Sequence, residues 1–156
     1  MRVDHAVVVV IGCAAIVATS PPPLPLVVQV DEKDVRFKDA PNLPAGAKIA
    51  VLEGDPSAHE MHFTIRLQVP AGFTLPAHTH PADERVTVLA GDITVTILAS
   101  GVSRASTHTF GVGAFYVTPP GVPHTVSSMN GATLQLTGVG PWRVEPWVPP
   151  APAPAR

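Results

Sequence analysis

The sequence contains very little cysteine and few charged side chains. Cys13 is the only cysteine among 156 residues, so the chain cannot close a disulfide on itself or build a cysteine-based metal cluster. Charged residues make up 14%, the formal net charge is −2 and no basic run is present, which argues against nucleic acid or an anionic membrane as partner. The sequence also lacks sustained helical periodicity, a nucleotide-binding loop and a Gly-x-Ser-x-Gly elbow.

Valine, alanine, threonine and proline are abundant instead, a mixture that favours strands and turns. Residues 61–69 and 92–98 alternate apolar and polar side chains, the pattern of half-buried strands. Many short strands separated by Gly/Pro turns predict an all-β sandwich or barrel. Further strands are expected at 26–30, 35–37, 48–52, 85–89, 114–118 and 133–139, with a loop over 100–107 and residues 108–110 leading into Gly113.

Residues 1–20 have the layout of a secretory signal peptide. Arg2 precedes an apolar run over 6–17, and Ala18-Thr19-Ser20 then leads into three prolines. The run is shorter than the ~20 apolar residues that a membrane span needs. We therefore expect export to the periplasm or the medium, with a buried N-terminal strand as the alternative interpretation. A lipoprotein anchor on Cys13 is disfavoured, because the apolar stretch before it is very short.

The length allows one domain with a sizeable core. After the signal at 1–20, residues 21–47 are interpreted as an N-terminal linker with the first strands, and residues 48–145 as a β-barrel domain. Residues 146–156 are rich in proline and alanine and are expected to form a disordered tail.

Four side chains have the types and spacing of a metal site. His78 and His80 are two residues apart, which on an extended strand points both imidazoles to one face. Glu84 heads the next strand, and His124 starts a later strand after a Pro-Pro-Gly turn. If these strands line one cavity, three imidazoles and a carboxylate converge. Such a set suits a divalent Fe, Mn, Ni, Co, Cu or Zn ion, and binding should weaken steeply below the usual histidine pKa of ~6.5.

At these residues the chain resembles the cupin superfamily. The first family motif is met without a spacing error, and the second is met except that Ser128 stands where asparagine is usual. The resemblance implies a double-stranded β-helix (a jelly-roll barrel), a divalent metal held by the four side chains with about two coordination positions open, and a homodimer. The matching residues are Gly72, His78, His80, Glu84 and Gly91 in the first motif, and Gly113, Pro119, Gly121 and His124 in the second.

The remaining polar candidates are weaker. Asp83 should point away from Glu84 into solvent, and Trp142 should pack back on the barrel as a closing plug. Arg66, Thr133 and Gln135 could line the cavity as substrate contacts, or equally form an outward polar face. His5, His59, His62 and His108 are poor ligand candidates. The side chains expected in the core are Phe63, Ile65, Leu67, Val86, Val88, Phe115 and Val117.

Two functions from different classes fit this sequence. One is a metal-dependent enzyme, a dioxygenase or isomerase, that binds a small oxygenated molecule at the metal. The other is a non-catalytic exported module that binds a metal or a ligand, similar to the cupin halves of sensor proteins. Further ionisable groups beside the metal would favour catalysis.

Overall fold

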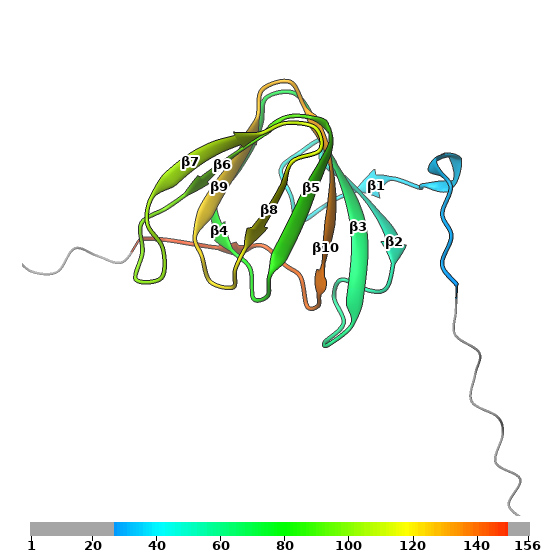
Figure 1. Cartoon of the computed structure of the whole chain (residues 1–156), viewed down its shortest axis with the longest axis horizontal. Coiled ribbons are helices and arrows are strands. Elements are labelled where there is room, and N and C mark those ends of the chain that lie inside the picture. Colours follow the sequence, from blue (N-terminus) through cyan, green and yellow to red (C-terminus); the bar gives the residue numbers. More distant parts are fainter. Residues whose placement is uncertain (1–26, 150–156) are drawn as a thin grey trace, which may run out of the picture.

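The computed structural model describes residues 27–149, so the expected signal peptide, Cys13 and most of the expected tail lie outside the described residues. No helix in the described part is long and apolar enough to cross a membrane. One 3-10 turn and eleven strands follow one another along the chain (Figure 1). They are η1 (Glu32–Asp34), β1 (Lys38–Asp39), β2 (Lys48–Glu53), β3 (His62–Val69), β4 (Phe73–Thr79), β5 (Glu84–Gly91), β6 (Ile93–Ile97), β7 (Ser106–Phe110), β8 (Phe115–Thr118), β9 (His124–Ser128), β10 (Ala132–Val139) and β11 (Glu145–Pro146).

The strands form two antiparallel sheets that face each other as a jelly-roll barrel (Figure 1). The six-stranded sheet has the order β1-β2-β3-β10-β5-β8, and the five-stranded sheet has the order β11-β4-β9-β6-β7. Several neighbouring strands are far apart in the sequence, as for β3 and β10, which pair from His62↔Val139 to Val69↔Ala132. The prediction of an all-β jelly roll is confirmed.

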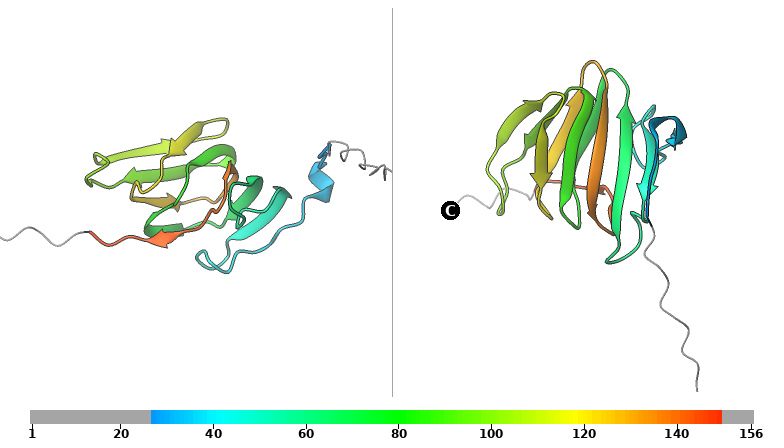
Figure 2. Two further views of the ribbon diagram at one scale, coloured as in Figure 1. Left: turned by 90° about the horizontal axis from the view of Figure 1, so that it is seen from below. Right: turned by 45° about the vertical axis from the view of Figure 1, so that its right-hand side comes forward.

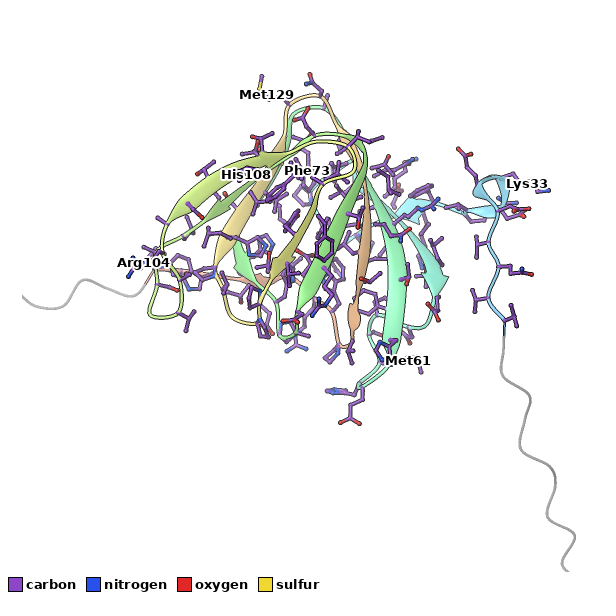
Figure 3. All side chains as sticks on the ribbon, in the orientation of Figure 1. Lys33, Met61, Phe73, Arg104, His108 and Met129 are labelled. Atoms are coloured by element: carbon purple, nitrogen blue, oxygen red, sulfur yellow. The ribbon has the colours of Figure 1, made fainter. Side chains whose placement is uncertain are left out.

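The core lies between the sheets and is filled by the inward faces of the alternating strands. In β3 every second residue, from Phe63 to Val69, is buried, while the residues between them are only partly covered. Figure 3 places Phe73 inside the barrel, whereas Met61 and Met129 lie at its outer ends. Five of the seven expected core residues are buried: Phe63, Ile65, Leu67, Val86 and Val88.

The expected burial of Phe115 and Val117 is wrong. Phe115 is 56% exposed and Val117 is 37% exposed. Strand β8 pairs with β5 so that Tyr116 lies opposite Val86, and paired residues share one face of a sheet. Tyr116 therefore points inward, and its two neighbours on β8 point outward. The strand was predicted correctly, but the apolar side chains lie on its solvent face.

Two expected strands at the N-terminal end do not form. Residues 27–30 and 35–37 have no strand pairing, and the first strand is the short β1, which pairs Lys38 with Ile49. In contrast, part of the expected 100–107 loop is strand, because β7 already begins at Ser106. There β6 and β7 are joined by threonine pairs, with Thr96 and Thr107 hydroxyl oxygens 3.1 Å apart.

Candidate metal centre

The strands bring all four predicted ligands to one end of the barrel interior. His78 is on β4 and lies opposite His124, the first residue of β9. His80 follows β4 directly, and Glu84 is the first residue of β5. All four side chains are buried, with 6% exposure or less. The structure therefore assembles, from three strands, the set that the spacing predicted.

A β-bulge in β4 turns the histidines inward. Before the bulge Phe73 and Leu75 point to the core, and the pairing of β4 with β9 then shifts between Leu75 and His78. Pro76 lies in this gap, where a residue without a backbone N–H costs no ladder hydrogen bond. The extra residue reverses the alternation, so even-numbered side chains face the interior from His78 onward.

The four polar groups converge closely. One ring nitrogen from each of His78, His80 and His124 lies within 4.8 Å of the other two. The Oε2 atom of Glu84 is 3.4 Å from Nε2 of His80 and 3.9 Å from Nε2 of His124. The three imidazoles and the carboxylate are therefore close enough together that these four side chains could hold one small cation.

The three imidazoles are oriented by backbone carbonyls, which can only accept hydrogen bonds. Each Nδ1 must therefore carry the proton, and in the neutral ring the Nε2 lone pair is free. This is the arrangement in which histidine ligates metals. The Nδ1 bonds are His78 to the carbonyl of Pro76 at 2.7 Å, His80 to Arg143 at 2.8 Å, and His124 to Val122 at 3.0 Å.

Buried atoms at this site lack partners. The Nε2 atoms of His80 and His124 are inaccessible to solvent and make no hydrogen bond. Buried polar atoms without partners cost about 1–3 kcal/mol each, and lone pairs that face one another and a carboxylate add repulsion. A divalent cation would satisfy all of these atoms at once, so the residues present fit such an ion.

The segment of residues 140–147, called here the closing segment, contacts two of the four side chains. Trp142 donates its indole N–H to Oε1 of Glu84 at 3.1 Å, which leaves Oε2 facing the imidazoles. The indole also stacks on His80, with ring centroids 5.7 Å apart and planes 17° apart. Because Trp142 packs against the core, the expected closing plug is confirmed. In Figure 2 the closing segment, orange to red, passes along β4 as strand β11.

Burial and neighbouring charges separate the pKa values of the histidines. Burial, with the proximity of His124, lowers the pKa of His78 to about 4, and burial also lowers the pKa of His124. Burial acts the same way on His80, but the carboxylate of Glu84, whose Oε2 atom is 3.4 Å from Nε2, outweighs it and raises the His80 pKa. For Glu84, burial favours the neutral acid, but His80 outweighs it and the pKa is lowered. The charged forms of His80 and Glu84 therefore stabilise each other.

The inner cavity beside these residues is small and mostly apolar. It has a volume of about 30 Å³ and is lined by aliphatic side chains together with His78, His80, Glu84 and Tyr116. A water needs ~10–15 Å³, so about two waters fit. Tyr116 is the only ionisable group in this lining besides the three candidate ligands. Burial and the charge of Glu84 raise its pKa well above 10, so its hydroxyl stays protonated and can donate a hydrogen bond.

Sequence reasoning missed Tyr116 and the Trp142–Glu84 bond. Inward-facing Tyr116 could have been found only from the true register of β8. The Trp142 bond joins residues far apart in the sequence, and no local pattern marks it. Thr118 was also missed: it lies opposite Glu84 in the β5–β8 ladder, and its buried hydroxyl has no hydrogen-bond partner.

The other predicted candidates lie outside the cavity. Arg66 donates weakly to Gln135 at 3.5 Å, and Thr133 is on the same outward face of β10, so these residues form an outward polar face. Asp83 pairs with Arg85 at 2.9 Å, half exposed. His59, His62 and His108 are exposed, and His5 lies outside the described residues. Ser128 lies opposite Phe73, at the far end of β9 from His124.

Comparisons with known proteins agree with this architecture. A family profile described as "Cupin domain" matches residues 65–139, which include all four candidate ligands. No curated protein sequence matches the chain. Among solved structures, the polyketide cyclase RemF from Streptomyces resistomycificus has a TM-score of 0.65 at 16% identity, over 81% of this chain and 89% of that one.

Two further solved structures share the fold. An RmlC-like cupin from Shewanella frigidimarina has a TM-score of 0.56 at 18% identity, over 70% of this chain and 87% of that one. An oxalate decarboxylase variant from Bacillus subtilis has a TM-score of 0.53 at 20% identity, over 69% of this chain and 28% of that one. At such identities the likeness carries the fold and not the activity.

Proposed function

Because this chain is a member of the cupin superfamily, with its cupin domain at residues 65–139, we propose that it binds one divalent metal ion through His78, His80, Glu84 and His124. One observation supports this most directly. Three buried imidazoles have their Nδ1 atoms bonded to backbone carbonyls, so that their Nε2 atoms are free to meet at a carboxylate. No other partner of the described residues satisfies the buried Nε2 atoms of His80 and His124.

The donor set restricts the ion to a class. Three nitrogen donors and one carboxylate suit Fe, Mn, Ni, Co, Cu or Zn better than calcium or magnesium, which prefer oxygen ligands. When bound, such an ion would supply a Lewis acid with open coordination positions. The protein's own part is to hold the rings as neutral donors, to fix Glu84 through Trp142, and to keep bulk water out of the inner cavity.

We further propose that the centre belongs to an enzyme, a dioxygenase or isomerase, that acts on a small oxygenated molecule. Tyr116 supports this proposal, because a protonated hydroxyl beside the metal can donate to an oxygen of a bound molecule. The unpartnered hydroxyl of Thr118 offers a second hydrogen bond on the same face of the sheet as Glu84. The similar structures include enzymes that act on polyketides and oxalate, which makes the proposal reasonable without extending their substrates to this chain.

A non-catalytic binding module is the second candidate. It is favoured by the small size of the inner cavity, about 30 Å³, and by the absence from its lining of a group whose pKa suits a general base besides the candidate ligands. In that case the metal centre would serve to sense or store an ion or a small ligand.

The experiment that tests the metal centre is metal analysis by mass spectrometry on protein purified from its native compartment. We expect close to one transition-metal ion per chain, and a matched Asp83→Asn variant should retain it because Asp83 lies outside the site. Metal-free native protein that also fails to bind Mn, Fe, Co, Ni, Cu or Zn on addition would refute the proposal.

Export and dimerisation are also proposals. The apolar run at 6–17 supports export, and N-terminal sequencing of the native protein should find a start between about residues 14 and 26. A native chain that keeps Met1 and stays in the cytoplasm would contradict this. The exposed Leu89, Phe115 and Val117 on β5 and β8 support a homodimer through this apolar surface, which light scattering can test.

A further inference from the structure

A groove at the β2 edge of the barrel lies next to the inner cavity, on the inner face of the six-stranded sheet, because Ile49 and Val51 pair with the inward-facing Leu67 and Ile65 of β3. This outer groove has a volume of about 550 Å³ and runs between strand β2, the loop that precedes it, and the closing segment. Ile49 and Val51 of β2 line one side, and Leu43 and Trp142 also face it. Val51 is 44% exposed, so the groove presents apolar surface to solvent.

Leu43 and Trp142 line the outer groove and the inner cavity at the same time. Both are partly buried and pack against the core. Leu43 belongs to the β1–β2 loop, and Trp142 to the closing segment, so neither is held by a strand ladder of the barrel. A single layer of two side chains therefore separates the groove from Glu84 and His80.

The two volumes show where a ligand could be held. The inner cavity, about 30 Å³, is too small for any organic molecule, whereas the outer groove falls in the ~300–1,000 Å³ range of small-molecule sites. We propose that the outer groove binds the apolar body of a small metal-chelating molecule, whose oxygen-bearing end passes between Leu43 and Trp142 to reach the metal. This inference rests on the metal centre proposed above and names the site and the class of its ligand.

The chemistry of the groove supports an apolar body. Four charged side chains line the groove. Two already have partners, since Arg143 pairs with Glu145 at 2.6 Å and Asp55 accepts hydrogen bonds from the hydroxyl and the backbone N–H of Ser57, while Lys38 and Asp39 are exposed on β1. The surface left for a ligand is formed largely by aliphatic and proline side chains. A ring or short acyl chain that ends in two adjacent oxygens would match this groove at one end and the metal at the other.

The position of Trp142 couples ligand entry to the metal centre. Its indole bonds to Oε1 of Glu84 and covers one face of His80. When a ligand displaces the indole, Oε1 loses that donor and the His80 ring is uncovered. Trp142 should therefore change its fluorescence when a molecule that fills the groove binds, and a Trp147→Phe background leaves it as the only tryptophan.

The test uses the full chain loaded with cobalt(II) and two probes with the same chelating group. Acetohydroxamate has only a methyl body, whereas benzohydroxamate carries a phenyl ring. Affinities are followed by the visible spectrum of cobalt and by Trp142 fluorescence. We expect benzohydroxamate to bind about tenfold more tightly than acetohydroxamate, because burial of about two methylene equivalents is worth that factor. Both probes should change the Trp142 fluorescence, because the chelating end of each must pass the indole to reach the cobalt.

Matched variants assign this preference to the groove. Val51→Asp should weaken benzohydroxamate about tenfold and leave acetohydroxamate within about twofold, because only the ring contacts the groove. Val117→Asp is the control, since Val117 is similarly exposed on β8, outside the groove. Leu43→Ala thins the wall without touching a candidate ligand and should speed benzohydroxamate association.

The outcomes separate the two proposals. If wild-type protein binds no cobalt, both the metal centre and the groove inference are refuted. If cobalt and acetohydroxamate bind but benzohydroxamate shows no preference, or Val51→Asp and Val117→Asp have equal effects, the metal centre stands and the groove inference is refuted. A selective effect of Val51→Asp, with faster association in Leu43→Ala, supports it.

Discussion

The imidazoles of His78 and His124 face each other across the β4–β9 ladder with their ring centroids 4.1 Å apart. Two protonated rings at this distance, both shielded from water, would repel strongly. The structure therefore favours neutral imidazoles here: burial and the nearby His124 lower the pKa of His78, and burial and the nearby His80 lower the pKa of His124. The pair is prepared to accept a cation before any metal arrives.

Metal affinity should fall less steeply with decreasing pH than three histidines that compete equally for protons would make it. The sequence alone suggested a steep fall below the usual histidine pKa, with three rings competing for protons. The lowered pKa values of His78, to about 4, and of His124 weaken the competition from protons at these two rings, whereas His80, whose pKa is raised by Glu84, still competes. The logarithm of zinc affinity should therefore fall with a slope well below three as pH decreases from about 7.5 to 5.5. A slope near three would contradict this reading of the site.

The metal-free protein should lose stability as pH falls below about 6.5. Folding holds the His78 pKa at about 4, so the unfolded chain takes up this proton first, and the native state is progressively disfavoured between these two values. The lowered pKa values of His124 and Glu84 act in the same direction, whereas the raised pKa of His80 opposes the trend. The loss from His78 is on the order of 3 kcal/mol. Urea melts of metal-free protein at several pH values measure it, and flat stability from pH 7 to 4 would disprove it.

Removing one ligand should empty the metal site and leave the barrel folded. Glu84→Gln keeps the shape and an oxygen for the Trp142 N–H, but it removes the charge that faces two imidazoles. Metal affinity should fall at least ~10-fold, and His124→Ala should have a larger effect. Metal content and thermal melting of metal-free wild type and variants separate binding from folding. Asp83→Asn is the control, and unchanged occupancy in both ligand variants would place the metal elsewhere.

Truncation should distinguish the inward and outward faces of the sheet. Ile65 is fully buried on β3, so Ile65→Ala should cost about 2–4 kcal/mol of unfolding free energy. Phe115→Ala should cost less than about 1 kcal/mol in the monomer, because that side chain is 56% exposed. Denaturant unfolding of both variants checks this. Equal costs would mean that the register of β8 is one residue different from that described.

Much of the site could be predicted from local spacing. The interval between His78 and His80 fixes a shared face on any extended strand, and the turn before His124 fixes where β9 starts. The bulge at Pro76 could not be predicted from the sequence. Odd-numbered side chains face the core before it and even-numbered side chains face the interior after it, so no single alternating pattern runs through β4. A similar one-residue offset explains why Phe115 was wrongly expected to point inward. Strand β8 has only four residues, which are too few to show from the sequence which alternate side chains face the core.

Apart from the packing of Trp142 on the barrel, long-range contacts could not be predicted. The outer groove depends on Leu43 and Trp142, which come from the β1–β2 loop and from the closing segment, at opposite ends of the described chain. Neither residue belongs to a motif. Their proximity results from sheet order, which hydrophobic alternation does not encode.

The match to the cupin family ends at residue 139, yet the carbonyl that orients His80 belongs to Arg143, and the N–H that fixes Glu84 belongs to Trp142. All four candidate ligands thus lie within the matched span, while the groups that orient two of them lie beyond it. A fragment cut at residue 139 would keep all four side chains and lose the groups that position His80 and Glu84.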